Sequence, residues 1–64
     1  MLVKLKTYDG QEYVQEIAEF NLVNFIDEVN NANGGSMVKF GDVGVMKSLI
    51  QVVDTRQGVH SFES

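Results

Sequence analysis

The segment that decides the fold class is Asn21–Asn31, which reads NLVNFIDEVNN. Its apolar residues recur at the i, i+3, i+4, i+7 spacing of an amphipathic helix: Leu22, Phe25, Ile26 and Val29. Asn21 is suited to be the N-cap, because its side-chain oxygen can accept a hydrogen bond from a free backbone N–H. Phe20 can pack on Phe25 as a hydrophobic staple. The sequence therefore predicts a helix of about 10 residues after Asn21.

The residues before this helix have the alternating apolar pattern of two strands. Leu2–Tyr8 forms the first predicted strand, and Gln11–Ala18 can return as the second. Between them, Asp9-Gly10 supplies the backbone freedom that a tight turn needs. We expect a β-hairpin here.

The residues after the helix predict a loop and two more strands. Asn30–Ser36 ends the helix, because Asn and Gly tolerate the left-handed conformation. Met37–Phe40 then predicts a short strand and Gly41–Gly44 a turn. Val45–Asp54 predicts a longer strand, with a bulge near Lys47-Ser48, where the apolar alternation slips.

The expected fold class is α+β, with the element order β-β-α-β-β in one small two-layer domain. The helix should pack on one face of an antiparallel four-stranded sheet. The domain should span residues 1–57, and residues 58–64 should form a flexible C-terminal tail. The predicted core residues lie on both layers: Leu5, Tyr13, Ile17, Phe25, Ile26, Val29, Val38, Phe40, Val45 and Val52.

Composition limits the classes of protein to consider. The 64 residues suffice for one domain with a thin core, and 44% of them are hydrophobic, which does not favour disorder. The chain has no cysteine, which excludes disulfides and thiolate sites. No apolar run approaches the roughly 20 residues that span a bilayer, and the N-terminus has no export pattern. We expect a cytoplasmic protein without a membrane segment.

The charges are unevenly distributed along the chain. Nine acidic residues against five basic ones give a net charge of −4, which counts against nonspecific binding of phosphate backbones. No basic residue lies between Lys6 and Lys39, and that interval holds six acidic residues: Asp9, Glu12, Glu16, Glu19, Asp27 and Glu28. One part of the surface should be negative. It could bind a basic protein, substitute for the phosphates of nucleic acid, or only keep the protein in solution.

The sequence predicts no catalytic, cofactor or metal site. The single histidine, His60, falls in the expected tail without a second ligand or a serine–carboxylate arrangement. Asp27 and Glu28 are adjacent on a helix, so their carboxylates point about 100° apart. Gly34-Gly35-Ser36 follows a helix and has no phosphate-loop pattern around it. We expect a protein that is not an enzyme.

The favoured hypothesis is a non-enzymatic protein-interaction module that forms a homo-oligomer, because a thin core and edge strands gain stability from a partner. Its expected partner is a protein of unknown identity, and nucleic acid is not favoured. The candidate partner contacts are acidic or exposed apolar residues: Tyr8, Glu12, Glu16, Glu19, Asp27, Glu28 and Met46.

Two stretches carry a partial pattern that resembles Sm-like RNA-binding barrels. The pattern consists of apolar alternation and turn residues: Val3-Lys4-Leu5, Gly10, Tyr13, Ile17, Phe20, Asn21, Asn24, Val38-Lys39-Phe40-Gly41-Asp42 and Val45. It departs at Gln15, where the family has a second glycine, and after Asn21, where the family continues as strand. The resemblance implies an alternative function, nucleic-acid binding by basic residues clustered on one face: Lys4, Lys6, Lys39, Lys47 and Arg56.

In size and acidity the chain also resembles the short acidic proteins encoded by phages and mobile elements of Gram-positive bacteria. That resemblance implies a protein that binds and modulates a host protein.

Overall fold

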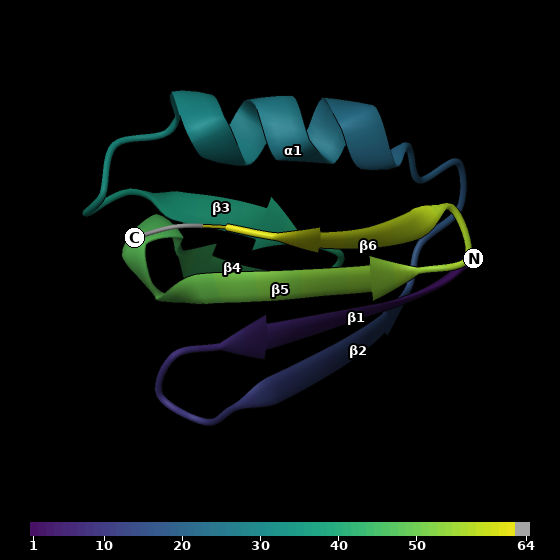
Figure 1. The fold of residues 1–64 in the computed structure, drawn as a ribbon, viewed down its shortest axis with the longest axis horizontal. Coiled ribbons are helices and arrows are strands. Elements are labelled where there is room, and N and C mark those ends of the chain that lie inside the picture. Colours follow the sequence, from purple (N-terminus) through teal and green to yellow (C-terminus); the bar gives the residue numbers. More distant parts are fainter. Residues whose placement is uncertain (63–64) are drawn as a thin grey trace.

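The computed structural model describes residues 1–62. Within them the chain folds as an α+β domain of one helix and six strands, all paired antiparallel (Figure 1). The elements follow in this order: β1 (Leu2–Thr7), β2 (Glu12–Glu16), α1 (Leu22–Asn31), β3 (Met37–Phe40), β4 (Val43–Met46), the 3₁₀ turn η1 (Lys47–Leu49), β5 (Ile50–Thr55) and β6 (Gly58–Ser61).

The strands form two sheets instead of the single sheet that the sequence predicted. One sheet has four strands in the order β2-β1-β5-β6, and β3 and β4 form a separate hairpin. The helix does not pack on one sheet alone. The Phe25 ring lies 6.1 Å from the ring of Phe40 in β3 and 6.3 Å from the ring of Phe62, which follows β6. Helix α1 therefore lies across both sheets, above β3 and β6 in Figure 1.

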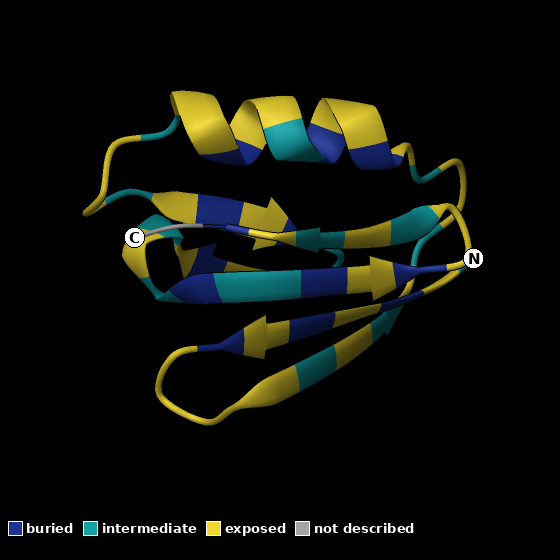
Figure 2. Cartoon of the chain, in the orientation of Figure 1, coloured by how far each residue is buried: buried dark blue, intermediate teal, exposed yellow. Residues whose placement is uncertain are grey.

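The core lies where the helix and the inner faces of both sheets meet (Figure 2). Its buried apolar residues come from α1, from all strands except β2 and β6, and from the residue after β6: Val3, Leu5, Leu22, Phe25, Val29, Val38, Phe40, Val45, Ile50, Val53 and Phe62. Tyr13, Ile17 and Ile26 pack against this cluster and are half-buried.

The predicted N-terminal hairpin is confirmed. Leu5 lies opposite Tyr13 in the register of β1 and β2. At the turn, the Gly10 N–H donates to the Thr7 carbonyl at 3.1 Å, and the Thr7 N–H donates to the Gln11 carbonyl at 3.0 Å. Gly10 has φ +85°, a conformation that glycine adopts without a steric penalty.

The predicted helix start is also confirmed. The side chain of Asn21 accepts a hydrogen bond from the Asn24 N–H at 3.0 Å, as expected of an N-cap. The rings of Phe20 and Phe25 lie 5.5 Å apart, which is the predicted staple. The cap and the staple fix the direction in which the chain enters α1.

The prediction of one long strand over Val45–Asp54 is wrong. The 3₁₀ turn η1 divides this segment, so that β4 pairs with β3 and β5 pairs with β1. The turn is held by the loop before β3, because the Lys47 N–H donates to the Ser36 carbonyl and the Ser48 N–H to that of Gly34. The slip in alternation at Lys47-Ser48 marked the right place, but the break is a change of sheet and not a bulge.

This break also changes which residue of β5 enters the core. Val53 is fully buried, whereas the predicted core residue Val52 is only half-buried. In the register of β1 against β5, Val52 lies opposite the exposed Lys6 and Val53 lies opposite the buried Leu5, so Val52 is on the outer face of the sheet. The predicted bulge near Lys47-Ser48 shifts the expected alternation by one residue, and this shift assigned the wrong face to Val52.

The prediction of a flexible tail that begins at residue 58 is wrong for residues 58–62. Residues 58–61 form β6, in which His60 lies opposite Val53 of β5. Phe62 is buried in the core, and its N–H donates to the Gln51 carbonyl at 2.7 Å. Residues 63 and 64 of the predicted tail lie outside the described residues.

Within residues 1–62, no helix is long and apolar enough to cross a membrane.

Candidate functional site

An open depression of about 490 Å³ lies beside the start of α1. Three parts of the chain line it: the end of β2 with the connection to α1, the first two turns of α1, and the end of β3 with its turn into β4. It thus brings together residues 16–28 and residues 39–42. In the sequence, these are separated by the end of α1, the loop after it and the start of β3.

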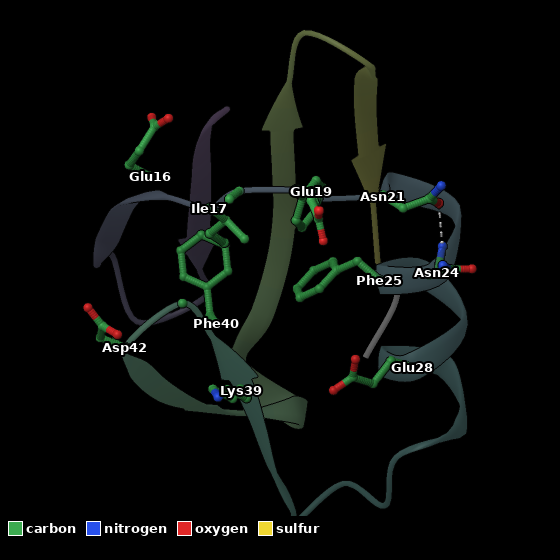
Figure 3. Close-up of a pocket in the computed structure, with 13 residues that line it drawn as sticks. Glu16, Ile17, Glu19, Asn21, Asn24, Phe25, Glu28, Lys39, Phe40 and Asp42 are labelled. Carbon is green, nitrogen blue, oxygen red and sulfur yellow. Dashed lines mark hydrogen bonds between the residues drawn. The ribbon is translucent and has the colours of Figure 1, made fainter.

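The floor of the cleft is apolar and aromatic. Figure 3 shows Ile17, Phe25 and Phe40 near its centre. Phe25 and Phe40 are core residues and present little surface, while Ile17 and Phe20 are half-buried and offer side-chain surface to a ligand. The floor is rigid, because its rings are packed on one another in the core.

The rim of the cleft is predominantly acidic (Figure 3). Four carboxylates line it against a single ammonium group, that of Lys39. The carboxylates come from three separate segments: Glu16, Glu19, Glu28 and Asp42. Of these, Glu16 accepts a hydrogen bond from the N-terminal ammonium group at 2.9 Å, and the described residues contain no other ion pair. The cleft therefore has an excess of negative charge over an apolar floor.

The β3–β4 turn, which carries Asp42, is held by a close contact with β2. Gly41 has φ +59°, and a Cβ at this residue would lie 2.6 Å from Gln15 Oε1. The same oxygen accepts a hydrogen bond from the Asp42 N–H at 3.3 Å. Gly41 thus lets the turn approach the Gln15 side chain, and that side chain orients the turn.

The opposite side of the cleft is fixed by Gln57, in the turn between β5 and β6. Its Oε1 accepts from the Leu22 N–H at 2.8 Å, and its Nε2 donates to the Phe20 carbonyl at 2.9 Å. The Leu22 N–H is one of the four N–H groups at a helix start that have no partner within the helix. Gln57 therefore attaches the cleft-lining segment before α1 to the four-stranded sheet.

Glu19 has an unusual backbone conformation. Its φ is +58°, and it is the only non-glycine residue with a positive φ among residues 1–62. This left-handed conformation costs a residue with a Cβ about 1 kcal/mol or more, and glycine would adopt it more easily. The turn at Ala18-Glu19 keeps an acidic side chain beside the cleft at that expense.

Three of the seven predicted contact residues lie together at this cleft, namely Glu16, Glu19 and Glu28. Glu12 and Asp27 are exposed but do not line it. Sequence reasoning did not place Asp42 or Lys39 beside these acidic residues, because the contact that brings the β3–β4 turn to β2 is not visible from local pattern.

Tyr8 and Met46 lie away from the cleft. The Tyr8 hydroxyl donates to the Phe62 carbonyl at 2.7 Å, so this half-exposed ring also holds the C-terminal segment. Met46 lies opposite Met37 in the β3–β4 hairpin, and both side chains are exposed. Phe62, which falls in the predicted flexible tail, is a core residue.

The five basic residues of the nucleic-acid alternative lie on four different elements. Lys4 and Lys6 are on β1, opposite Asp54 and Glu12 respectively. The others lie on β3, on η1 and in the β5–β6 turn: Lys39, Lys47 and Arg56. Lys4 and Lys6 share the exposed side of β1, and the nucleic-acid alternative stays a prediction.

His60 does not lie in a tail. It belongs to β6, is half-buried, and its ring packs edge-on against Phe62 at 4.6 Å. Among residues 1–62, no group of three or more His, Cys, Asp or Glu side chains is arranged to hold a metal ion.

The protein is thus a small α+β domain that has a cleft with an acidic rim and an apolar floor. No model of a protein family, no curated protein and no solved structure matches this chain.

Proposed function

We propose that this chain is a non-enzymatic, cytoplasmic protein-interaction module that binds a basic segment of a partner protein in the acidic cleft. The observation that carries the proposal is the combination of four carboxylates and one ammonium group around an apolar floor. The resemblance to small acidic phage proteins would make the partner a protein of the bacterial host.

The charge of the cleft favours a cationic ligand. The carboxylates of Glu19 and Glu28 point toward the floor in Figure 3, and carboxylates on a concave surface focus the electrostatic potential and attract a basic segment at a distance. The net charge of −4 acts in the same direction. Such attraction is screened at moderate salt, so binding should weaken as the ionic strength rises.

The floor of the cleft favours Lys or Arg side chains over a free inorganic cation. These residues can lay their methylene stems on Ile17 and Phe20 while the charged end reaches a rim carboxylate. A cation over the Phe20 ring would add about 0.5–1 kcal/mol at such an exposed site. A basic peptide with some apolar residues therefore matches the cleft better than charge alone would.

The proposal is tested by selecting ligands for the full chain from a displayed library of random peptides. The enriched peptides should be rich in Lys or Arg with interspersed apolar residues. In an NMR titration with one of them, the amides of residues 16–28 and 39–42 should shift. Enrichment of neutral or acidic peptides, or shifts confined to other segments, would contradict the proposed site.

A matched pair of variants separates the cleft from overall charge. Glu19→Gln with Glu28→Gln removes two rim carboxylates, and Glu12→Gln with Asp27→Asn removes two exposed carboxylates outside the cleft. Both double variants change the net charge by the same amount. The first should weaken peptide binding about tenfold or more, corresponding to about 1.4 kcal/mol, and the second should change it little. Equal losses would show that the cleft has no special role.

A further inference from the structure

The outer face of the four-stranded sheet carries exposed apolar side chains that the core does not use. Strand residues alternate between two faces, and Val3, Leu5 and Val53 occupy the inner one. On the outer face, the side chains of Val14 in the edge strand β2 and Val59 in the edge strand β6 are 45% and 65% exposed. This outer face points away from the helix and from the β3–β4 hairpin, because the inner face packs on them.

The register places four outer-face residues in one row across the sheet. Val14 of β2 lies opposite Lys4 of β1, and Lys4 lies opposite Asp54 of β5. Asp54 in turn lies opposite Val59 of β6. Across the strands β2-β1-β5-β6, the row is therefore apolar, positive, negative and apolar.

This row is complementary to its own reverse. A two-fold axis that runs parallel to the strands, between β1 and β5 in the plane of contact, would turn the row of a second copy around. Lys4 then faces Asp54 of the second copy, and Val14 faces its Val59. We propose that two copies of this chain form a symmetric dimer by packing these outer sheet faces together, as isologous interfaces and aligned sheet packing allow.

The charges in this row are available for contacts between copies. Among residues 1–62, neither Lys4 nor Asp54 has an ion-pair partner within 4.0 Å, although the two lie on paired strands. Each can therefore reach across to the opposite charge on the second copy. The charges therefore favour a second copy whose row runs in the opposite direction. A row that ran in the same direction would place Lys4 opposite Lys4 and Asp54 opposite Asp54.

The neighbouring row accepts the same symmetry without conflict. It contains Glu12, Lys6, Val52 and Ser61, in the order of the strands. The same two-fold axis places Glu12 opposite Ser61 of the second copy and Lys6 opposite its Val52. No like charges meet, and the Lys6 stem can cover the half-buried Val52.

The size of the face limits the strength of the dimer. Four strands about 4.8 Å apart and about 20 Å long give a face of roughly 20 by 20 Å on each copy. Packed together, two such faces bury less than the total surface of about 1,200–2,000 Å² that is typical of stable complexes. The dimer should therefore exchange with monomer in the micromolar concentration range.

The test is the concentration dependence of the solution mass, measured by sedimentation equilibrium on the full chain and on two charge-reversal variants. The two central residues of the row are at positions 4 and 54. Lys4→Asp makes both of them negative, and Asp54→Lys makes both of them positive. Each variant alone should remain monomeric, because the symmetry brings like charges together. An equimolar mixture of the two should recover the dimer, because each negative pair then faces a positive pair.

Asp27→Lys is the matched control, since it makes the same charge change as Asp54→Lys on the exposed face of α1. It should dimerise like the original chain, and circular dichroism should show that all variants are folded. A chain that stays monomeric up to millimolar concentration would overturn the proposal. So would dimers of either single variant, or a mixture that fails to associate.

Discussion

The contact between Gly41 and Gln15 yields a stability prediction that can be worked out from the structure. In Gly41→Ala, the new Cβ would lie 2.6 Å from Gln15 Oε1, 2.9 Å from its Cγ and 3.0 Å from its Cβ. The Gln15 side chain cannot simply rotate away, because its Cβ is fixed by strand β2. The side chain or the turn must therefore move.

Three contributions set the magnitude of the change. At φ +59°, a residue with a Cβ costs about 1–2 kcal/mol. The loss of unfolded-state entropy in Gly→Ala offsets about 0.4–1 kcal/mol of this. Displacing Gln15 removes the hydrogen bond to the Asp42 N–H, worth about 0.5–1.5 kcal/mol, and adds steric strain of about 1 kcal/mol. The sum is a loss of about 2–3 kcal/mol.

The assay is thermal and urea unfolding of the original chain, Gly41→Ala, Gln15→Ala and the double variant. For a domain of this size, 2–3 kcal/mol lowers Tm by roughly 10–20 °C. In the Gln15→Ala background, the same Gly41→Ala change should cost only about 0.5–1 kcal/mol, since the hydrogen bond and most of the steric conflict are already gone. If Gly41→Ala lowered the free energy of unfolding equally in both backgrounds, the steric reasoning would be refuted. Only the cost of the left-handed backbone conformation at residue 41 would then remain.

Three further changes test other contacts by the same unfolding measurement. Asn21→Ala removes the N-cap and should cost about 1 kcal/mol; no change would mean that the helix start is held by other contacts. Gln57→Ala removes both hydrogen bonds to the segment before α1 and should cost about 1–2 kcal/mol, whereas a loss below 0.5 kcal/mol (about the surface norm) would contradict its clamping role. Phe62→Ala should cost about 3 kcal/mol or more, because the ring is buried; a flexible tail would give almost no loss.

Local features of the fold were predictable from the sequence because short-range physics determines them. The Asp9-Gly10 turn and the Asn21 cap each depend on residues a few positions apart, and both are confirmed. The division of Val45–Asp54 by η1 was not predictable in the same way. It depends on hydrogen bonds from Lys47 and Ser48 to the distant loop before β3.

The C-terminal strand was missed for a related reason. Polar residues such as His60 and Ser61 gave the end of the chain the composition of a tail. Two tertiary interactions outweigh the weak strand propensity of these polar residues. The backbone of β6 forms hydrogen bonds with β5, and the side chain of Phe62 is buried in the core. Tertiary context here overrides local propensity.

The candidate site was predictable only in part. The excess of acidic residues between Lys6 and Lys39 indicated a negative surface, and three of its members do meet at the cleft. The sequence could not separate them from Glu12 and Asp27, because that distinction depends on which end of β2 and which side of α1 lie beside the β3–β4 turn. Nor could it show that an apolar floor lies between the carboxylates.

The cleft and the two rows of the outer sheet face share no residue, and this makes the two proposals independently testable. Lys4 and Asp54 do not line the cleft, so reversing either charge alone should abolish dimerisation while changing the peptide affinity of each monomer little. The rim variant with Glu19→Gln and Glu28→Gln should do the opposite. If both surfaces function, each dimer carries two clefts, and a partner with two linked basic segments should bind more tightly than one with a single segment. That gain should disappear in the Lys4→Asp variant, because a monomer offers only one cleft.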